Sequence, residues 1–454
     1  MSIQESEFSW AEAKESANLV LFKNSGKYLS DIEIKVLQGA WQGKTYEKMA
    51  QFYGYSPEYL NKDIGNKLWN KLSDALGEKV RKKNFKEALK REWKKHQTLS
   101  NFISENISVN QWVTELPFPE GSVALSSSFY LEREGIESLC YETVMKPGSL
   151  IRIEAPKLMG KTSLVRRILA YAGNHDYQTV YLDLQNVDKA ILKNLDKFLR
   201  WLCLKVSYYL KLENQLNEYW DTEILGSNDN CTAYFEEYLL AKINSPLVLA
   251  FDNADRILSS AELGEDLFGM LRSWHEKGKI FDLWKQLNLV LAYSTETYTL
   301  LDINQSFLNA GVPVYLLEFN LQQIQDLAYL HQLNWNETEI KKLMSLVGGH
   351  PYLVRLAMYY IHSEKVSLDQ LLKQSTTEVG IYSSHLRRHL DNLQQSTPLA
   401  EAFKKVVDSL EPVELDPIKT HKLYSLGLIT RQDNQVMPRC GLYREYFQRV
   451  LTLK

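Results

Sequence analysis

The sequence predicts a mixed α/β protein, in which an all-α N-terminal domain precedes a parallel sheet with a phosphate-binding loop (P-loop), a helical lid and a C-terminal winged helix. Three observations lead to this prediction. Short apolar segments alternate with helical patterns in the middle of the chain, a strand–loop–helix unit contains Gly160-Lys161-Thr162, and capped helical patterns fill residues 1–95. A chain of 454 residues is also too long for one hydrophobic core.

Residues 1–95 have the order of breaks that is typical of a helix-turn-helix. The segment Leu29–Glu33 opens a helix with a Ser/Asp cap, Gly43 begins a turn, and Ser56–Glu58 starts a further helix after Gly54. From Lys62 to Lys95, twelve Lys and Arg residues stand against five Asp and Glu, a local excess of +7. This excess indicates either contact with DNA phosphates or an ordinary solvated helical surface.

The segment Ala155–Thr162 follows a predicted strand and precedes a predicted helix, Ser163–Tyr171, which is the context of a P-loop. Backbone N–H groups at the start of such a helix bind phosphate oxygens. Lys161 is expected to reach the β- and γ-phosphates, and the Thr162 hydroxyl to bind Mg²⁺. Ala155 replaces the usual first glycine, which costs little if its backbone is not left-handed. The residues expected to contact ATP or ADP here are Pro156, Lys157, Leu158, Met159, Gly160, Lys161, Thr162 and Ser163.

Four further segments complete the predicted sheet and carry the remaining candidate catalytic residues. The apolar strand ending at Asp252 places a carboxylate beside Mg²⁺, and Asn253 follows where an active ATPase usually has a glutamate. An amide can position water but cannot accept its proton, so Asp255 is considered as a substitute base. Ser294, at the end of the next strand, is a candidate γ-phosphate sensor, although serine is common at strand ends. The predicted strands are Ser149–Glu154, Gln178–Leu184, Leu247–Asp252, Leu287–Ser294 and Val312–Leu317.

With these features placed, the chain from about Ser122 to Leu451 resembles the AAA-like ATPase domain family that is common in cyanobacteria and related to STAND and Orc-type P-loop proteins. Ala155 agrees with the pattern of this family, whereas Asn253 does not, since the family generally has glutamate there. The first 80 or so residues resemble the helix-turn-helix of proteins associated with von Willebrand A and MoxR systems. The segments that carry the AAA-like resemblance are Ser128–Arg133, Ala155–Leu164, Gly226–Thr232, Gly348–Leu353 and Val436–Cys440.

The resemblance implies two further contacts with the nucleotide. Tyr130 and Arg133 belong to an N-terminal box that packs near the adenine in relatives. His350 and Pro351 belong to a lid segment that closes over the base. From the residues alone, this segment is a helix junction, because glycines end one helix and Pro351 suits the first turn of the next. Candidate arginine fingers are Arg256, Arg272, Arg387 and Arg388, although a structural or surface role is the simpler interpretation of each.

The expected organisation is a helix-turn-helix domain at 1–95, a linker at 96–120, an AAA-like P-loop core at 121–318, a lid at 319–395 and a winged helix at 396–454. The longest apolar stretches have strand length, so no membrane span is expected. The four cysteines are scattered, which suits a reducing cytoplasm.

We expect an ATP-dependent switch with slow hydrolysis, whose nucleotide state acts through the N-terminal domain. It belongs in this interpretation to a signalling or conflict system, with DNA, an effector protein acting in trans, or further copies of the chain as partners. One alternative is a DNA-binding regulator in which ATP or ADP is a fixed structural ligand. The other is a protein adaptor whose helix-turn-helix never meets DNA, since the sequence shows no clear set of base-reading residues.

Overall fold

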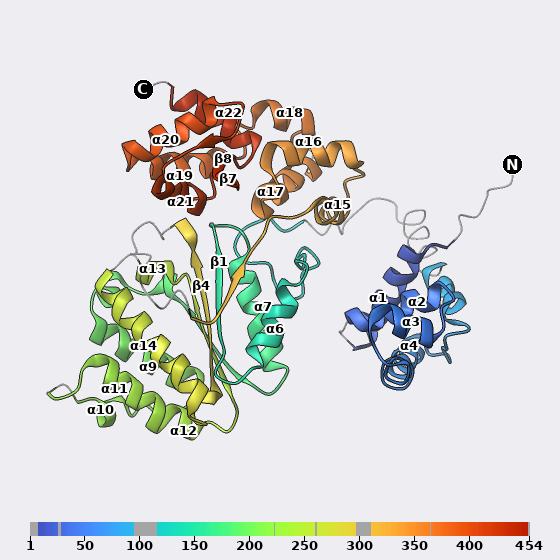
Figure 1. The fold of residues 1–454 in the computed structure, drawn as a ribbon, viewed down its shortest axis with the longest axis horizontal. Coiled ribbons are helices and arrows are strands. Elements are labelled where there is room, and N and C mark those ends of the chain that lie inside the picture. Colours follow the sequence, from blue (N-terminus) through green and yellow to red (C-terminus); the bar gives the residue numbers. More distant parts are fainter. Residues whose placement is uncertain are drawn as a thin grey trace, which may run out of the picture. The chain divides into compact units, whose positions relative to one another are not determined.

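The computed structural model describes residues 8–25, 29–94, 116–221, 223–258, 261–296, 310–363 and 365–452 (Figure 1). Its contacts divide the chain into two units, Met1–Thr114 and Glu115–Lys454. The predicted linker at 96–120 lies mostly outside the described residues. No helix in the described part of the chain is long and apolar enough to cross a membrane.

The N-terminal unit is helical, as predicted. Ser30 caps the start of α2 (Asp31–Trp41), and its backbone N–H donates to Glu33 Oε2 over 2.9 Å. Gly54 ends α3 (Tyr46–Tyr53) with a left-handed φ of 74°. The elements are α1 (Trp10–Ser25), α2 (Asp31–Trp41), α3 (Tyr46–Tyr53), the π-helical turn η1 (Tyr59–Gly65), α4 (Asn66–Leu76) and a helix at residues 85–94.

One apolar core holds these helices together. Its buried members recur at helical spacing, such as Leu68 and Leu72 on α4, and they meet Leu37, Met49 and Phe85 from the other helices. Most of the Lys and Arg residues between Lys62 and Lys94 are exposed.

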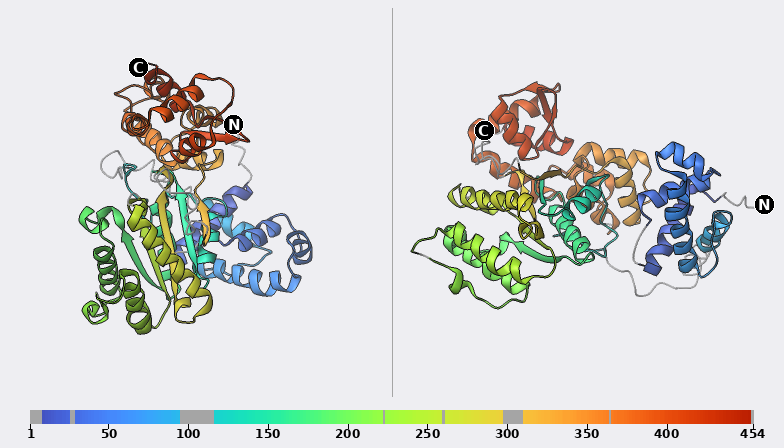
Figure 2. Two further views of the ribbon diagram at one scale, coloured as in Figure 1. Left: turned by 60° about the vertical axis from the view of Figure 1, so that its left-hand side comes forward. Right: turned by 60° about the horizontal axis from the view of Figure 1, so that its bottom comes forward.

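The second unit is built on a five-stranded parallel sheet, with the strand order β2-β3-β4-β1-β5. Both faces of this sheet are covered, which explains why its central strands are apolar throughout. Val248 and Ala250 pack with helices α6 (Ile136–Val144) and α7 (Lys161–Gly173), whereas Leu247 and Leu249 pack into a separate core with α9 (Leu195–Tyr209) and α14 (Ala261–Ile280). These two pairs of helices lie on opposite sides of the sheet (Figures 1 and 2). The strands are β1 (Leu150–Ala155), β2 (Gln178–Asp183), β3 (Leu247–Asp252), β4 (Leu287–Ser294) and β5 (Val312–Tyr315), close to the predicted ranges.

The helices of the sheet domain flank both of its faces. They are α6 (Ile136–Val144), α7 (Lys161–Gly173), α8 (Lys189–Leu192), α9 (Leu195–Tyr209), α10 (Leu216–Tyr219), α11 (Ser227–Ala233), α12 (Leu240–Lys242), α13 (Asp255–Leu258) and α14 (Ala261–Ile280). Three short non-α turns join them: η2 (Leu184–Asn186), η3 (Tyr234–Leu239) and η4 (Trp284–Gln286).

A helical region follows the sheet, as predicted. Its helices are α15 (Leu321–Leu330), α16 (Glu337–Val347), α17 (Pro351–His362), α18 (Leu368–Gln374) and α19 (Ser383–Gln394). The C-terminal elements are α20 (Thr397–Asp408), β6 (Val413–Glu414), α21 (Pro417–Ser425), β7 (Ile429–Gln432), β8 (Gln435–Pro438) and α22 (Gly441–Val450). Gln432 pairs with Gln435, so a two-residue turn joins β7 to β8. One continuous core runs through all these elements, from Phe319 to Leu451.

Candidate nucleotide-binding site

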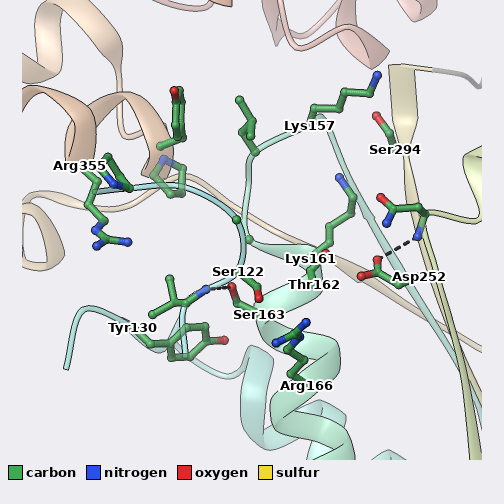
Figure 3. Close-up of a pocket in the computed structure, with 18 of the residues that line it drawn as sticks. Ser122, Tyr130, Lys157, Lys161, Thr162, Ser163, Arg166, Asp252, Ser294 and Arg355 are labelled. Atoms are coloured by element: carbon green, nitrogen blue, oxygen red, sulfur yellow. Dashed lines mark hydrogen bonds between the residues drawn. The ribbon is translucent and has the colours of Figure 1, made fainter. Parts of the chain in front are cut away.

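The carboxyl ends of the parallel strands bring the predicted site residues to one edge of the sheet. Ala155 on β1 is in register with Ser294 on β4, and Asp183 on β2 is in register with Asp252 on β3. A cavity of about 480 Å³ opens at this edge. Figure 3 shows Lys161, Thr162 and Asp252 at one side of it and Arg355 at the other.

The loop from Ala155 to Lys161 has the backbone of a phosphate cradle. Ala155 is the last residue of β1 and is extended, so the alanine carries no backbone strain. Leu158 and Gly160 are left-handed, with φ values of 64° and 100°. Helix α7 begins directly afterwards, at Lys161, and therefore points its free N–H groups at the cavity.

Lys161 is folded back onto its own loop. Its Nζ donates to the carbonyl oxygens of Ala155 over 2.9 Å and of Pro156 over 2.8 Å. Burial lowers the pKa of this ammonium group to about 8, against the opposing attraction of Asp255, Glu296 and Asp252. A bound phosphate would supply the close negative charge that this partly buried cation lacks.

Arg133 joins the loop to the segment that follows β5. Its Nη2 donates to Met159 O over 2.6 Å and its Nε to Leu317 O over 3.0 Å. The guanidinium group lies 5.2 Å from the ring centre of Phe319. Because Arg133 is 6% exposed and lines the cavity, it fixes the loop from one wall of the site.

Tyr130, on the same wall, is held from both ends. Its hydroxyl donates to Glu137 Oε1 over 2.6 Å, and the Arg167 guanidinium lies 3.4 Å from its ring centre. Burial and the charge of Glu137 raise the pKa of Tyr130, which is therefore neutral. An immobile aromatic ring at the cavity is suited to packing against a planar ligand.

Asp252 lies at the tip of β3 and is 1% exposed. Its Oδ2 accepts the Tyr181 hydroxyl over 2.9 Å, and its Oδ1 accepts the backbone N–H of Asn253 over 2.9 Å. The side chain of Asn253 turns away from Asp252, since its Nδ2 donates to Asp183 Oδ1 over 2.8 Å. Asn253 is left-handed, with a φ of 55°, a conformation that asparagine and aspartate tolerate better than other non-glycine residues.

The end of β4 is tied to the P-loop by a carboxylate. Glu296 Oε1 accepts the backbone N–H of Lys157 over 3.1 Å and lies 3.7 Å from Arg388 Nη2. Ser294 is 2% exposed and lines the cavity, and its backbone N–H donates to Asp255 Oδ1 over 3.1 Å. Glu296 therefore links the loop to an arginine on α19, one of the helices at residues 319–395 that the sequence predicts as a lid.

The lid forms the far wall. Pro351, Tyr352 and Arg355 from α17 and Arg388 from α19 line the cavity. Arg355 lies 4.9 Å from the ring centre of Phe129, and its Nη2 donates to Pro117 O over 3.2 Å. A ligand in this cavity is thus enclosed by both the sheet domain and the lid.

Most of the predicted nucleotide contacts line the cavity, and three do not. Pro156, Met159 and His350 are absent from its lining, and His350 is buried at the start of α17. The predicted residues that line it are Tyr130, Arg133, Lys157, Leu158, Gly160, Lys161, Thr162, Ser163, Asp252, Asn253, Ser294 and Pro351.

The four candidate arginine fingers separate clearly. Only Arg388 is among the described lining residues. Arg256 donates to the carbonyl oxygens of Leu184, Gln185 and Val187, which anchors the turn after β2. Arg387 pairs with a surface glutamate, and Arg272 lies on α14 outside the cavity.

Several lining residues were not singled out from the sequence, and Asp183, Tyr181 and Arg355 are the clearest. Asp183 had a usable signal, because it stands at the end of a predicted parallel strand, where the carboxyl ends of neighbouring strands meet. Arg355 had none beyond its place in a helical pattern.

The donor set beside the loop fits a magnesium ion. The hydroxyl of Thr162 and the carboxylate of Asp252 both line the cavity, and both are hard oxygen ligands of the kind that Mg²⁺ prefers. When bound there with a nucleotide, the ion would neutralise phosphate charge.

A left-handed loop between a buried strand and a helix, a lysine in that loop and a strand-tip aspartate define a P-loop protein of the ATPase type. The chain belongs to the AAA-like domain family, whose model matches residues 118–449. Residues 8–92 match the N-terminal helix-turn-helix of vWA-MoxR associated proteins. No curated protein matches the sequence.

Solved structures resemble a large part of this chain at low identity. The Walker-type ATPase of Pyrococcus abyssi is 14% identical, with a TM-score of 0.51 over 70% of this chain and 95% of that chain. The ORC2 protein of Aeropyrum pernix, solved with ADPNP and ADP, is 16% identical, with a TM-score of 0.42 over 71% and 93%. AMPPCP-bound DnaA of Aquifex aeolicus is 12% identical, with a TM-score of 0.34 over 66% and 79%. The first likeness shows a shared fold, and the two lower scores carry no argument.

Proposed function

We propose that this chain is an ATP-dependent molecular switch, in which a nucleotide between the P-loop and the lid controls the N-terminal helix-turn-helix. The observation that carries the proposal is the composition of the cavity wall, which combines P-loop residues such as Lys161 with lid residues such as Arg355 and Arg388. A ligand that contacts both walls binds the closed arrangement of P-loop and lid more tightly than an open one, and it therefore shifts the equilibrium toward the closed state.

The site suits the triphosphate part of ATP. Free N–H groups of the loop, the ammonium group of Lys161 and the guanidinium group of Arg388 offer positive charge on three sides. Tyr130 and Tyr352 also line the cavity and supply ring surfaces against which a base would pack.

The C-terminal region is in direct contact with the site, which supports coupling. Thr295, next to the predicted γ-phosphate sensor, donates its hydroxyl to Ser425 O on α21 over 2.7 Å. A Cβ atom added to Gly427 would lie 3.0 Å from Pro156 of the P-loop. If the P-loop or the end of β4 changes conformation, these contacts with the C-terminal region must therefore change as well.

We further propose that hydrolysis is slow, because Asn253 occupies the position of the usual glutamate. An amide cannot accept the proton of the attacking water, and the loss of a proton acceptor at this position typically costs about 10²–10⁴-fold in rate. Phosphate release that already reaches several turnovers per second in the wild type would contradict this proposal.

Nucleotide-dependent protection from hydrogen exchange tests the switch. We expect ATP to protect the P-loop together with the lid helices α17 and α19, and Lys161→Ala to abolish that protection. Lys146→Ala, at an exposed position outside the cavity, is the matched control. Protection confined to the P-loop, with no change in the lid, would favour a fixed structural ligand over a switch.

The Lys and Arg residues of the N-terminal unit support DNA binding through the phosphates as one output of the switch. Binding of an acidic protein partner is the alternative output. Lys83 and Lys86 are exposed, whereas Lys82 donates to Lys44 O over 2.6 Å and lies 4.5 Å from the Tyr46 ring centre. Lys82 therefore contributes to the fold through its hydrogen bond. Lys83 and Lys86 are the better residues for testing DNA binding, and Lys86 Nζ lies 4.5 Å from the Trp41 ring centre. A gel-shift assay of the full chain at low salt, with and without ATP, separates the two outputs.

A further inference from the structure

The position after the strand-tip aspartate carries an amide in this protein, but a carboxylate is bonded to that amide. Asp183 stands at the end of β2, in register with Asp252 on β3, and lines the cavity. Its Oδ1 accepts the Nδ2 of Asn253 over 2.8 Å. A carboxylate at neutral pH can only accept, so the amide must present its NH₂ group to Asp183.

Asp183 retains the capacity to bind water. Within the described part of the chain, its Oδ1 accepts Asn253 Nδ2 and the backbone N–H of Gln185, and its Oδ2 accepts Asn186 Nδ2. An ionised carboxylate has about four acceptor positions, so these three donors leave one. The bonds also fix the carboxylate in place at the cavity wall, which limits the reorganisation needed for catalysis.

The other carboxylates around the loop are engaged differently. Asp252 is placed to bind Mg²⁺ and accepts the Tyr181 hydroxyl. Asp255 Oδ1 accepts the backbone N–H of Ser294, and Glu296 faces Lys157 and Arg388. Of these four carboxylates, Asp183 is the one that accepts the side-chain amide of Asn253, the residue at the usual position of the base.

We propose that Asp183 is the catalytic carboxylate for ATP hydrolysis, with Asn253 as the amide that orients it and the attacking water. This inference rests on the proposed nucleotide site. The water oxygen forms a bond to the γ-phosphorus as the bond from that phosphorus to the β–γ bridging oxygen breaks. The electron pair of the broken bond stays on ADP, and the proton of the water passes to the Asp183 carboxylate and then to the departing phosphate or solvent. In an ATPase with the usual glutamate, the carboxylate follows the strand-tip aspartate of β3. In this protein the amide Asn253 stands there, and the carboxylate Asp183 stands at the end of β2.

Two variants test the exchange. Asp183→Asn removes the proton acceptor but keeps an amide oxygen for Asn253 Nδ2, so the hydrogen bond and the fold are expected to persist. The double variant Asp183→Asn/Asn253→Asp returns the carboxylate to the position after Asp252, and aspartate tolerates the left-handed backbone there. Asp188→Asn, five residues along and outside the cavity lining, is the matched control.

Two measurements on the full chain separate this inference from nucleotide binding itself. The affinity for a fluorescent ATP analogue with Mg²⁺ reports the site, and single-turnover phosphate release reports the base. For Asp183→Asn, we expect unchanged or tighter binding, since a negative charge near the phosphates is lost, and hydrolysis slower by about 10²-fold or more. We expect the double variant to recover to within about tenfold of the wild-type rate and Asp188→Asn to match the wild type.

Hydrolysis by Asp183→Asn at the wild-type rate would overturn the inference, as would a double variant as slow as the single one. Wild-type protein that binds the analogue but releases no phosphate above the Lys161→Ala background would also overturn it, while leaving the nucleotide site intact. Failure to bind the analogue would refute the proposed function itself. If Asp183→Asn fails to fold, the double variant decides, because it rebuilds the same hydrogen bond with donor and acceptor exchanged.

Discussion

Four buried histidines are expected to make the lid and C-terminal region acid-sensitive. His331, His350, His385 and His389 are between 1% and 6% exposed. Burial, aided by nearby arginines, lowers the pKa of His331 to about 4 and that of His350 to about 3. The pKa values of His385 and His389 are lowered in the same direction, mainly by burial and by neighbouring histidine or arginine charge.

The sign and size of the effect follow from these pKa values. In the unfolded chain a histidine titrates near 6.5, whereas in the folded chain His331 and His350 stay neutral to much lower pH. The unfolded state therefore takes up protons first as the pH falls below about 6.5, and stability is lost. Between pH 7 and pH 5 each such histidine lowers the free energy of unfolding by about 2 kcal/mol. His331 and His350 together account for about 4 kcal/mol, a large part of the roughly 5–15 kcal/mol that stabilises a typical domain.

Urea denaturation at pH 7 and pH 5, followed by near-ultraviolet circular dichroism, measures this loss. His331→Gln is expected to lose about 2 kcal/mol less than the wild type between the two pH values, whatever its stability at pH 7. His175→Gln, at an exposed histidine on the sheet domain, serves as the control and should follow the wild type. The reasoning would be refuted if all three proteins lost the same free energy, or if the wild type lost none.

Three further changes test the loop, the lid and the N-terminal unit. Lys161→Ala should abolish binding of a fluorescent ATP analogue while the thermal unfolding curve persists, because the loop loses its point charge for the phosphates; unchanged affinity would exclude the P-loop assignment. Gly349→Ala should cost about 1–3 kcal/mol in chemical denaturation, since its Cβ would overlap the backbone carbonyl of Phe319. Charge reversal at Lys83 and Lys86 should weaken DNA binding equally on all sequences and flatten the plot of log affinity against log salt by about 1.8, at about 0.9 per phosphate contact; an unchanged slope would place DNA elsewhere or nowhere on this unit.

The parts of the fold that local sequence determines could be predicted. The strands Leu247–Asp252 and Leu287–Ser294 have the predicted bounds, because parallel strands covered on both faces are apolar over their whole length. The P-loop was recognisable for a similar reason, since strand, loop and helix are contiguous in the chain.

The parts that depend on contacts between distant segments could not be predicted. Asn253 was identified as a missing base, but its bond to Asp183 joins residues 70 positions apart and requires the strand order of the sheet. His350 was expected at the nucleotide, whereas it is buried at the start of α17 and packs against His385 of α19, with 5.5 Å between ring centres. Whether a histidine faces a cavity or a core depends on the angle at which a helix packs, and no local pattern encodes that angle.

Glu296 shows how such distant contacts can link the site to the lid. Its carboxylate accepts the backbone N–H of Lys157 in the P-loop and attracts Arg388 from α19 at 3.7 Å. A bound phosphate offers Arg388 a second anion on the cavity side, so the arginine divides its interaction between Glu296 and the ligand. Coupling between two equilibria is reciprocal. If bound nucleotide stabilises one position of α19 through Arg388, a displacement of α19 must weaken nucleotide binding by the same free energy. In the proposed switch, a partner that binds the lid would thus regulate nucleotide affinity without touching the phosphate loop.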